Sequence, residues 1–365
     1  MSENLLKNTI SLDFVLLLAT DLKKQSPLYN IEFNQKQFLT GFTDSHWGTL
    51  ELKQRARFIV SQLGIHLSGS YRDQIRLISP LAEKHQGGLK AMIFPDFIEV
   101  YGLDDLKTSL NALKEFTFYF SSEFAIRPFI VKYEAQMLKE LLKMSKDPDE
   151  HIRRLSSEGL RPRLPWSFKL RRLITAPQLA FPVLENLKDD SSLYVRKSVA
   201  NHLNDISKDH PKLILKIAKT WYGKSERTDW IIKHALRTLL KKGNPTALKL
   251  FGFQQKSLPK LQKLSTTYKT FKIGKHLEFA AQFAPPANSK DTLRIEYAIH
   301  YLKNNGSYSK KVFKISEKNY PVASFVVQRK HSLRQMTTRK HYKGLHHLEI
   351  IVNGVVLGKT SFTLS

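Results

Sequence analysis

The sequence has no cysteine, few acidic residues for its size, and no apolar run long enough to cross a membrane. Without cysteine the chain forms no disulfide and offers neither a thiolate metal ligand nor a thiol nucleophile. The apolar run from Phe14 to Ala19 follows Asp13 and lacks a basic leader, and a membrane helix needs about 20 apolar residues. We therefore expect an amphipathic helix there, in a cytoplasmic protein that does not enter the membrane.

Motifs typical of several enzyme classes are also missing. The sequence contains no GxxxxGK[ST] phosphate loop, no HExxH and no GxSxG, which argues against the P-loop nucleotide, zincin and nucleophile-elbow chemistries. His346 and His347 stand side by side, and the other histidines are scattered without metal-ligand spacing. We therefore predict no metal site.

Basic residues are what the sequence has in excess. Its 365 residues include 59 Lys and Arg against 32 Asp and Glu, a formal net charge of +27. Such a charge attracts polyanions, nucleic acid above all. The 41% hydrophobic content is ordinary for a globular protein, and the length allows two domains.

Up to about residue 255 the apolar residues follow a helical period, with an internal repeat. IRRLSSEGL (152–160), VRKSVANHL (195–203) and IIKHALRTL (231–239) align without gaps at spacings of 43 and 36 residues. Helix pairs repeating about every 40 residues are typical of HEAT-like solenoids. We predict an all-α solenoid over 1–258; chance similarity among amphipathic helices is the alternative.

From about residue 265 the apolar residues alternate, as in strands. The clearest run is Leu293 to Tyr301, and Asn305-Gly306 and Asn353-Gly354 read as hairpin turns. A first strand is expected at Phe271 to Phe279, and about seven short strands predict an immunoglobulin-like β-sandwich over 265–365. The fold class is therefore α+β, with two domains.

One segment of the β-rich part is strongly basic. Residues 329–347, RKHSLRQMTTRKHYKGLHH, contain six cations and no acid. We expect a loop or strand edge in which Arg339, Lys340 and Lys343 contact DNA phosphates. A basic loop that is merely solvated is the alternative.

SSEGLRPRLPW (156–166) contains the lone carboxylate of a second basic stretch. Between Glu150 and Glu185 there is only Glu158 against seven cations. A carboxylate repels a DNA backbone, but it helps cleave an N-glycosidic bond, because it stabilises the cationic sugar and can orient a water. Trp166 offers an aromatic face to a cationic base or a deoxyribose. The alternative is an ion pair of Glu158 with Arg154 or Arg161 that organises the turn.

The repeat adds a second carboxylate to this surface. Arg154 and Glu158 are four residues apart and share a helix face. In the next copy Asn201 occupies the position of Glu158, and Asp205 lies four residues further along the same face.

SSEGLRPRLPW, the similar SSEFAIRPF (121–129) and VRKSVANHLNDISKDHP (195–211) closely resemble motifs of the AlkC family of DNA alkylation repair proteins. The resemblance covers roughly residues 1–255 and implies a HEAT-like-repeat DNA glycosylase, distantly related to the AlkD family. It implies excision of cationic N3-alkylated bases, chiefly 3-methyladenine and 3-methylcytosine, without metal or nucleotide cofactor. It also implies a bent duplex and a lesion that is not rotated into a deep pocket.

The resemblance assigns catalytic surroundings residue by residue: Glu123, Glu158, Trp166 and Asp205. Some proteins of the AlkC type carry an immunoglobulin-like domain after the repeats, as predicted here. We expect phosphate contacts from the cations around these positions and in the basic β segment, namely Arg127, Arg154, Arg161, Arg163, Arg171, Arg172, Arg196, Lys197, Arg339, Lys340 and Lys343.

The sequence thus predicts a monofunctional glycosylase that acts as a monomer on duplex DNA containing alkylated bases, in the bacterial nucleoid, and starts base excision repair. Lyase activity is not expected, because no Schiff-base lysine accompanies the carboxylates. A non-catalytic HEAT-repeat scaffold that binds DNA or RNA remains the alternative. A binder of anionic membranes is disfavoured, because no long basic amphipathic helix stands out.

Overall fold

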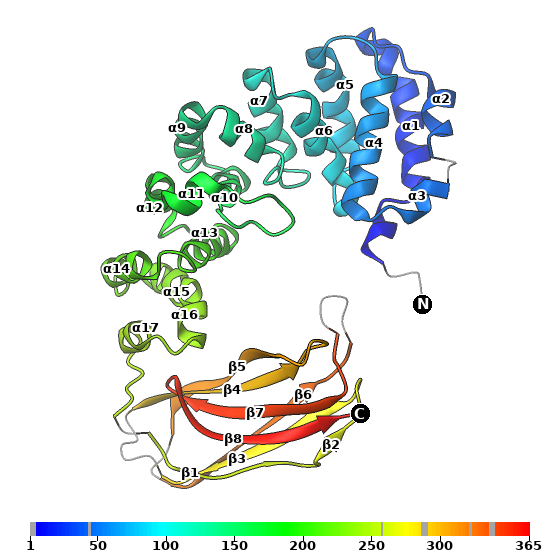
Figure 1. The fold of residues 1–365 in the computed structure, drawn as a ribbon. Coiled ribbons are helices and arrows are strands. Elements are labelled where there is room, and N and C mark those ends of the chain that lie inside the picture. Colours follow the sequence, from blue (N-terminus) through cyan, green and yellow to red (C-terminus); the bar gives the residue numbers. More distant parts are fainter. Residues whose placement is uncertain (1–4, 43–44, 257, 286–290, 321–322, 336–339) are drawn as a thin grey trace. The chain divides into compact units, whose positions relative to one another are not determined.

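The structure, a computed structural model, describes residues 5–42, 45–256, 258–285, 291–320, 323–335 and 340–365. The chain forms two compact units, of which the first comprises residues 1–209 and 221–235 and the second 210–220 and 236–365. Figure 1 shows helices first and strands last along the chain, so the predicted α+β class is confirmed. Within the described residues, no helix is long and apolar enough to cross a membrane.

The first unit is entirely helical in its described part. Its elements are η1 (Leu6–Thr9), α1 (Leu12–Gln25), η2 (Ser26–Tyr29), α2 (Gln35–Thr40), α3 (Ser45–Thr49), α4 (Leu52–His66), α5 (Tyr71–Lys84), η3 (Leu89–Met92), α6 (Ile93–Tyr101), α7 (Leu106–Phe116), α8 (Ile126–Lys132), α9 (Glu134–Met144), α10 (Glu150–Gly159), α11 (Arg171–Thr175), η4 (Pro177–Ala180), α12 (Phe181–Leu187), α13 (Leu193–Ile206) and α15 (Glu226–Ala235). The apolar run at Phe14 lies in α1, as expected.

The second unit combines short helices with strands. Its elements are α14 (Pro211–Trp221), α16 (Arg237–Lys241), α17 (Pro245–Leu250), β1 (Leu261–Thr266), β2 (Thr270–Phe271), β3 (His276–Phe283), β4 (Thr292–Leu302), β5 (Tyr308–Asn319), β6 (Phe325–Ser332), β7 (Gly344–Val352) and β8 (Val355–Leu364). Pro211 and Pro245 start α14 and α17, since proline lacks the amide hydrogen that the first turn leaves unpaired.

The internal repeat corresponds to helices that pack in series. IRRLSSEGL lies on α10 and VRKSVANHL on α13, and α13 packs against both α10 and α15. The third copy begins on α15 and ends on α16. Val195, Val199 and Leu203 of α13 are fully buried, and burying such a side chain stabilises a fold by about 1.5–3 kcal/mol.

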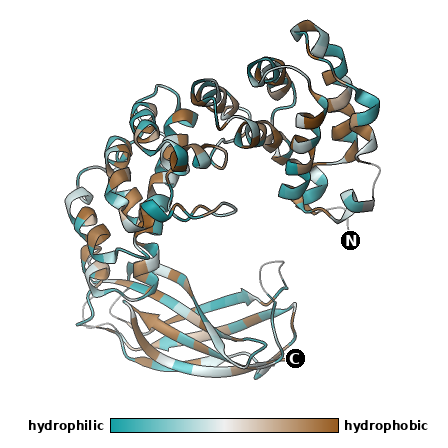
Figure 2. Ribbon diagram, turned by 45° about the horizontal axis from the view of Figure 1, so that its top comes forward, coloured by the Kyte–Doolittle hydropathy of each residue, from teal (hydrophilic) through white to brown (hydrophobic). Residues whose placement is uncertain are grey.

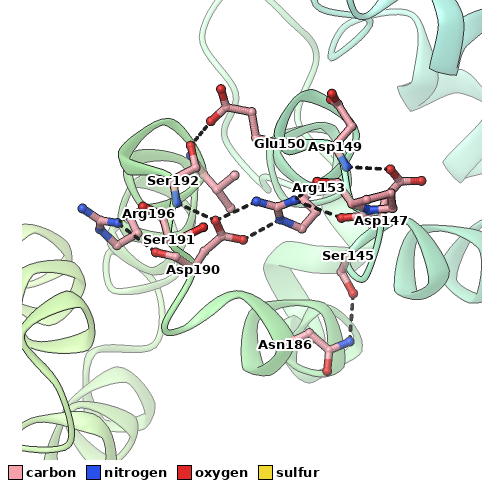
Figure 3. A network of polar contacts seen from close by, with 12 residues as sticks. Ser145, Asp147, Asp149, Glu150, Arg153, Asn186, Asp190, Ser191, Ser192 and Arg196 are labelled. Atoms are coloured by element: carbon pink, nitrogen blue, oxygen red, sulfur yellow. Dashed lines mark hydrogen bonds and ion pairs between the residues drawn. The ribbon is translucent and has the colours of Figure 1, made fainter.

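Equivalent arginines bind the turns before α10 and α13. Arg153 Nη1 donates to the carbonyls of Asp147 and Pro148 at 2.9 and 2.8 Å. Arg196, its counterpart in the next copy, donates to the carbonyls of Asp190 and Ser191, both at 2.8 Å (Figure 3). Arg153 also forms a bidentate pair with Asp190, at 2.7 and 3.1 Å. Arg153 thus joins its own copy of the repeat to the next one.

The strands form two mainly antiparallel sheets, and the larger one has a parallel pair at its edge. The three-stranded sheet has the order β1-β3-β6, the five-stranded sheet β2-β8-β7-β4-β5, and β2 pairs parallel with β8. Hydrophobic and hydrophilic residues alternate along the strands (Figure 2). The buried side of each sheet supplies one core that includes Phe283, Ile295, Leu348 and Phe362.

The expected first strand from Phe271 to Phe279 is wrong. Gly274, with φ +92°, turns the chain between β2 and β3, and β1 precedes both. Thr270–Phe271 and His276–Phe283 therefore pair with different sheets. The strand from Leu293 to Tyr301 and both Asn-Gly turns are confirmed. The division at 258–265 stays a prediction, with β1 starting at Leu261.

Candidate active site

Three segments of the first unit bring the predicted carboxylates together. Glu123 lies in the turn before α8, Glu158 in the last turn of α10, and Asp205 in the last turn of α13. Residues 160–170, which we call the RPRLPW loop, connect α10 to α11 and contain Arg161. Glu158 and Asp205 lie close together because α10 packs against α13, and Glu123 joins them through Arg154 of α10.

Alternating ion pairs connect these side chains. Glu123 Oε2 lies 2.5 Å from Arg154 Nη1, and Arg154 Nη2 lies 3.5 Å from Glu158 Oε1. Arg161 bridges the two other carboxylates, with Nη1 at 2.6 Å from Glu158 Oε1 and Nη2 at 2.8 Å from Asp205 Oδ2. We call this row the carboxylate chain; it ends at Lys208, whose Nζ lies 2.9 Å from Asp205 Oδ1. The expectation that no lysine accompanies the carboxylates is therefore wrong.

The members of the carboxylate chain differ in their access to solvent. The side chain of Glu123 is 14% exposed, that of Glu158 5% and that of Asp205 2%, whereas Lys208 is 42% exposed. Burial opposes the charged form of Arg154, but the charges of Glu123 and Glu158 outweigh it and raise the pKa of Arg154. The sequence analysis offered an ion pair with Arg154 or Arg161 as the structural alternative for Glu158, and both pairs are present.

Glu158 keeps one oxygen clear of these contacts. Both arginines bind its Oε1, and within the described part of the chain no hydrogen bond or ion pair reaches Oε2. Asp205 has both oxygens occupied, by Arg161 and by Lys208. A small cavity of about 20 Å³ adjoins Ser121, which hydrogen-bonds Glu123. This volume suits a water molecule rather than a nucleobase.

Trp166 lies in the RPRLPW loop but makes no contact with the carboxylate chain among the described residues. Its indole is largely exposed, and its backbone has φ +64°, a left-handed conformation that is costly for a residue with a Cβ. The Trp166 carbonyl accepts a hydrogen bond from Lys53 Nζ of α4 at 2.8 Å. The structure thus presents the indole outward, where a bound molecule can reach it.

Arg127 does not face a DNA phosphate, contrary to our expectation. Its side chain is fully buried, and its guanidinium donates to the carbonyls of Gly159, Arg161 and Phe168 at 2.9, 2.8 and 2.6 Å. Burial lowers the pKa of Arg127 to about 10, and the nearby charge of Arg161 adds to this. The motif SSEFAIRPF thus contributes a structural arginine to the RPRLPW loop.

Other predicted phosphate contacts are also engaged inside the protein. Arg161 is buried in the carboxylate chain, Arg154 pairs with Glu123, and Arg196 binds its turn. These three arginines are held by internal partners, so direct phosphate contacts from them are not supported. Arg163 forms a bidentate pair with Asp209 and is partly exposed.

The exposed cations among the predicted set remain candidates for phosphate contact. Arg339 lies outside the described residues. The described ones are Arg171, Arg172, Lys197, Lys340 and Lys343. Arg172 lies 3.6 Å from Glu134 but keeps 63% of its side chain exposed.

Several residues of the site were missed by the sequence reasoning. Ser121 Oγ accepts a hydrogen bond from Arg154 at 2.6 Å, and His202 of α13 hydrogen-bonds the Ser157 carbonyl of α10 at 3.0 Å. His202 directly follows Asn201, the position that the repeat aligns with Glu158, so the repeat register could have indicated it. No local pattern indicated Lys53, which lies 113 positions before Trp166. No group of three or more His, Asp or Glu residues within the described ranges could hold a metal ion.

Comparisons with known proteins agree with this architecture. A family model described as the C-terminal Ig-like domain of the uncharacterised protein YhaZ matches residues 260–365. The uncharacterized protein YhaZ of Bacillus subtilis is 44% identical over 334 residues, which cover 91% of this chain and 92% of that protein.

A solved structure matches almost the whole chain. It is the alkylpurine DNA glycosylase AlkC of Pseudomonas fluorescens bound to DNA containing an abasic site analog. The similarity covers 99% of both chains with a TM-score of 0.91 and 37% sequence identity. With the three motifs, the repeat helices, the carboxylate chain and the Ig-like sandwich all in place, the chain belongs to the AlkC family of DNA alkylation repair proteins.

Proposed function

We propose that the protein is a monofunctional DNA glycosylase that releases cationic N3-alkylated bases, such as 3-methyladenine and 3-methylcytosine, from duplex DNA and so starts base excision repair. The observation that carries this proposal is the carboxylate chain. It places Glu123, Glu158 and Asp205 in one row inside a strongly basic protein. The 37% identity to an alkylpurine DNA glycosylase over 99% of the chain supports the same conclusion.

The chemistry needs carboxylates more than it needs a general acid. When the bond from C1′ to the base nitrogen breaks, the base keeps the electron pair and leaves as a neutral molecule, because it was cationic before. Positive charge then develops on the sugar, where a carboxylate stabilises it. A water attacks C1′, its proton passes to a carboxylate, and an abasic site remains.

The free oxygen makes Glu158 the better placed of the two buried carboxylates to orient this water, since Oε2 has no partner among the described residues. Asp205 gains a free oxygen when the exposed Lys208 leaves it for a DNA phosphate. Glu123, the more exposed carboxylate, and the outward-facing Trp166 are then left to contact the lesion. A cationic base suits both, by charge and by cation-π attraction.

The substrate is reached without a deep pocket in this proposal. The cavity beside Ser121 is too small for a base. A larger cavity of about 620 Å³ is lined by Phe168, Lys169 and Leu170 at the end of the RPRLPW loop, but by none of the three carboxylates. The repeats over 1–258 supply the site, the sandwich over 265–365 adds basic surface, and the protein acts as a monomer.

Amide substitutions test the proposal, because they remove the charge and keep the shape. Asp205→Asn and Glu158→Gln are each expected to lower single-turnover release of 3-methyladenine from a defined duplex by more than about 100-fold, with DNA affinity equal or higher. Asp209→Asn is the matched control: it lies four positions beyond Asp205 and pairs with Arg163 of the same loop, and it should keep base release within about threefold.

The buried ion pairs of Glu158 and Asp205 favour one second candidate, a non-catalytic scaffold that binds DNA or RNA. Their carboxylates already neutralise arginines, so a purely structural role is physically coherent. A wild-type protein that binds methylated duplex but releases no base would establish the scaffold.

A further inference from the structure

The RPRLPW loop is held by side chains that do not belong to the carboxylate chain. Its backbone forms no helix or strand between Leu160 and Leu170. One backbone hydrogen bond, from Leu170 to the Pro162 carbonyl at 3.2 Å, spans the loop, and side chains bind other carbonyls. Four carbonyl oxygens from residues 159 to 168 accept hydrogen bonds from just two cations, Arg127 of α8 and Lys53 of α4.

Arg127 binds both ends of the loop. One nitrogen, Nη1, donates to the carbonyls of Gly159 and Arg161, and Nη2 donates to Phe168. Its guanidinium carbon also lies 5.3 Å from the centre of the Phe168 ring. In the described chain no carboxylate pairs directly with it, so a fully buried cation is compensated by backbone carbonyls. The planar fork of arginine suits three convergent acceptors, whereas lysine has a single nitrogen.

The residues held in this way are those that the reaction uses. The backbone of Arg161 is fixed by Arg127, while its side chain sets the positions of Glu158 and Asp205. Trp166 is held in a left-handed conformation, and its carbonyl is bound by Lys53, whose Nζ also lies 4.6 Å from the Phe124 ring. A displacement of about 1 Å at a reacting group can cost about 100-fold in rate.

We propose that Arg127 and Lys53 are positioning residues for base release, which fix the RPRLPW loop through its carbonyls and so place Arg161 and Trp166. The proposal rests on the proposed glycosylase function. It assigns these two cations to the loop backbone, so their loss acts on the chemical step and leaves DNA affinity nearly unchanged.

Chemical rescue tests Arg127. Arg127→Ala is expected to lower single-turnover base release by about 100-fold, and millimolar guanidinium chloride should restore at least about tenfold by occupying the vacated site. Sodium chloride at equal ionic strength is the control for salt effects on DNA binding, and Arg76→Ala, on the surface of α5, is the control for loss of an arginine. A rate equal to wild type, or a folded variant that guanidinium does not rescue, overturns the proposal.

Lys53 provides a variant that leaves the core intact, because its side chain is exposed. Lys53→Met should lower the rate of base release about tenfold at saturating enzyme. The control is Lys107→Met, which removes an exposed lysine on α7, and the two variants should bind DNA with equal affinity. An effect on affinity alone would assign Lys53 to DNA binding and overturn its positioning role.

Limited proteolysis tests the conformation of the RPRLPW loop independently of base release. Arg127→Ala should speed tryptic cleavage between Arg163 and Leu164, compared with wild type and Arg76→Ala, because the loop loses its anchor. If wild type releases the base and the variants release it at the same rate and are cleaved no faster by trypsin, the positioning roles are overturned and the proposed function stands. Absence of base release by wild type overturns the proposed function itself, and the reaction role of both cations with it.

Discussion

His202 lies in the middle of the contact between α10 and α13. Its side chain is fully buried, and Nδ1 lies 3.0 Å from the carbonyl of Ser157. Because a carbonyl only accepts, Nδ1 carries the hydrogen of a neutral imidazole. Burial lowers the pKa of His202 to about 3, and the charge of Arg161 contributes in the same direction.

This depressed pKa predicts a loss of stability in mild acid. In the unfolded chain His202 takes up a proton near pH 6.5, so its contribution is fully present above pH 6.5 and is lost as the pH falls toward 3. At pH 5 the loss amounts to about 2 kcal/mol. His202→Asn retains an amide donor near Nδ1 but does not titrate. Urea unfolding gives the difference in unfolding free energy between pH 7.5 and pH 5, which should be about 2 kcal/mol smaller in the variant than in wild type. Equal differences in the two proteins would contradict the assignment.

At the scale of elements, the turn between β7 and β8 attaches the sandwich to α16 and α17 within the second unit. Asn353 Nδ2 donates to the Gln254 carbonyl at 2.6 Å, and Gln255 Nε2 donates to the Asn353 carbonyl at 2.9 Å. Gly354 packs against Gly243, between α16 and α17. The Asn-Gly pair that the sequence indicated as a hairpin turn is therefore also a contact surface.

Gly354→Ala is expected to weaken this attachment. Gly354 has φ +80°, and a Cβ there would lie 2.7 Å from Leu248 Cδ1 and 2.9 Å from Gly243 Cα. Gly306→Ala is the matched control, because it has φ +75° in the other Asn-Gly turn with nothing within 4 Å of the added Cβ. Both variants carry backbone strain of about 1–2 kcal/mol, and we expect Gly354→Ala to lose about 1–3 kcal/mol more through overpacking. Equal melting temperatures of the two variants would refute the contact.

At the scale of the whole molecule, the charge of +27 is spread over both units. Part of the charge of the first unit is neutralised internally, as in the carboxylate chain, so exposed cations such as Lys197 and Arg171 remain for phosphates. In the second unit Lys340 and Lys343 lie exposed between β6 and β7. Total charge sets the long-range attraction, and the location of each cation decides whether it contacts a phosphate.

Lys340→Ala with Lys343→Ala is expected to weaken DNA binding for every sequence. If each lysine neutralises one phosphate, the slope of log affinity against log salt should become shallower by about 1.8. Lys23→Ala with Lys24→Ala is the matched control, since these exposed lysines on α1 remove the same charge elsewhere. Binding titrations from low to moderate salt measure both; identical slopes in the two double variants would remove this segment from the interface.

Local patterns in the sequence by themselves determined the helical and β-rich parts, the repeat on α10 and α13 and the Asn-Gly turns. They also drew attention to Glu158 and Asp205 as candidates, whereas Glu123 entered through the resemblance to the AlkC family. These features depend on periodicity, on proline and glycine, and on unusual motifs, which are local properties of the sequence. The break at Gly274 was missed, because alternation continues on both sides of it.

Only the tertiary structure decided how the charges are shared. It paired Arg161 with two carboxylates from different helices, buried Arg127 and brought Lys53 to Trp166. The physical reason is that the partners of Arg127 and Lys53 are backbone carbonyls, which every residue possesses, so no residue type marks them in the sequence. Whether a cation meets a phosphate or a carbonyl depends on its burial, and burial is a property of the fold.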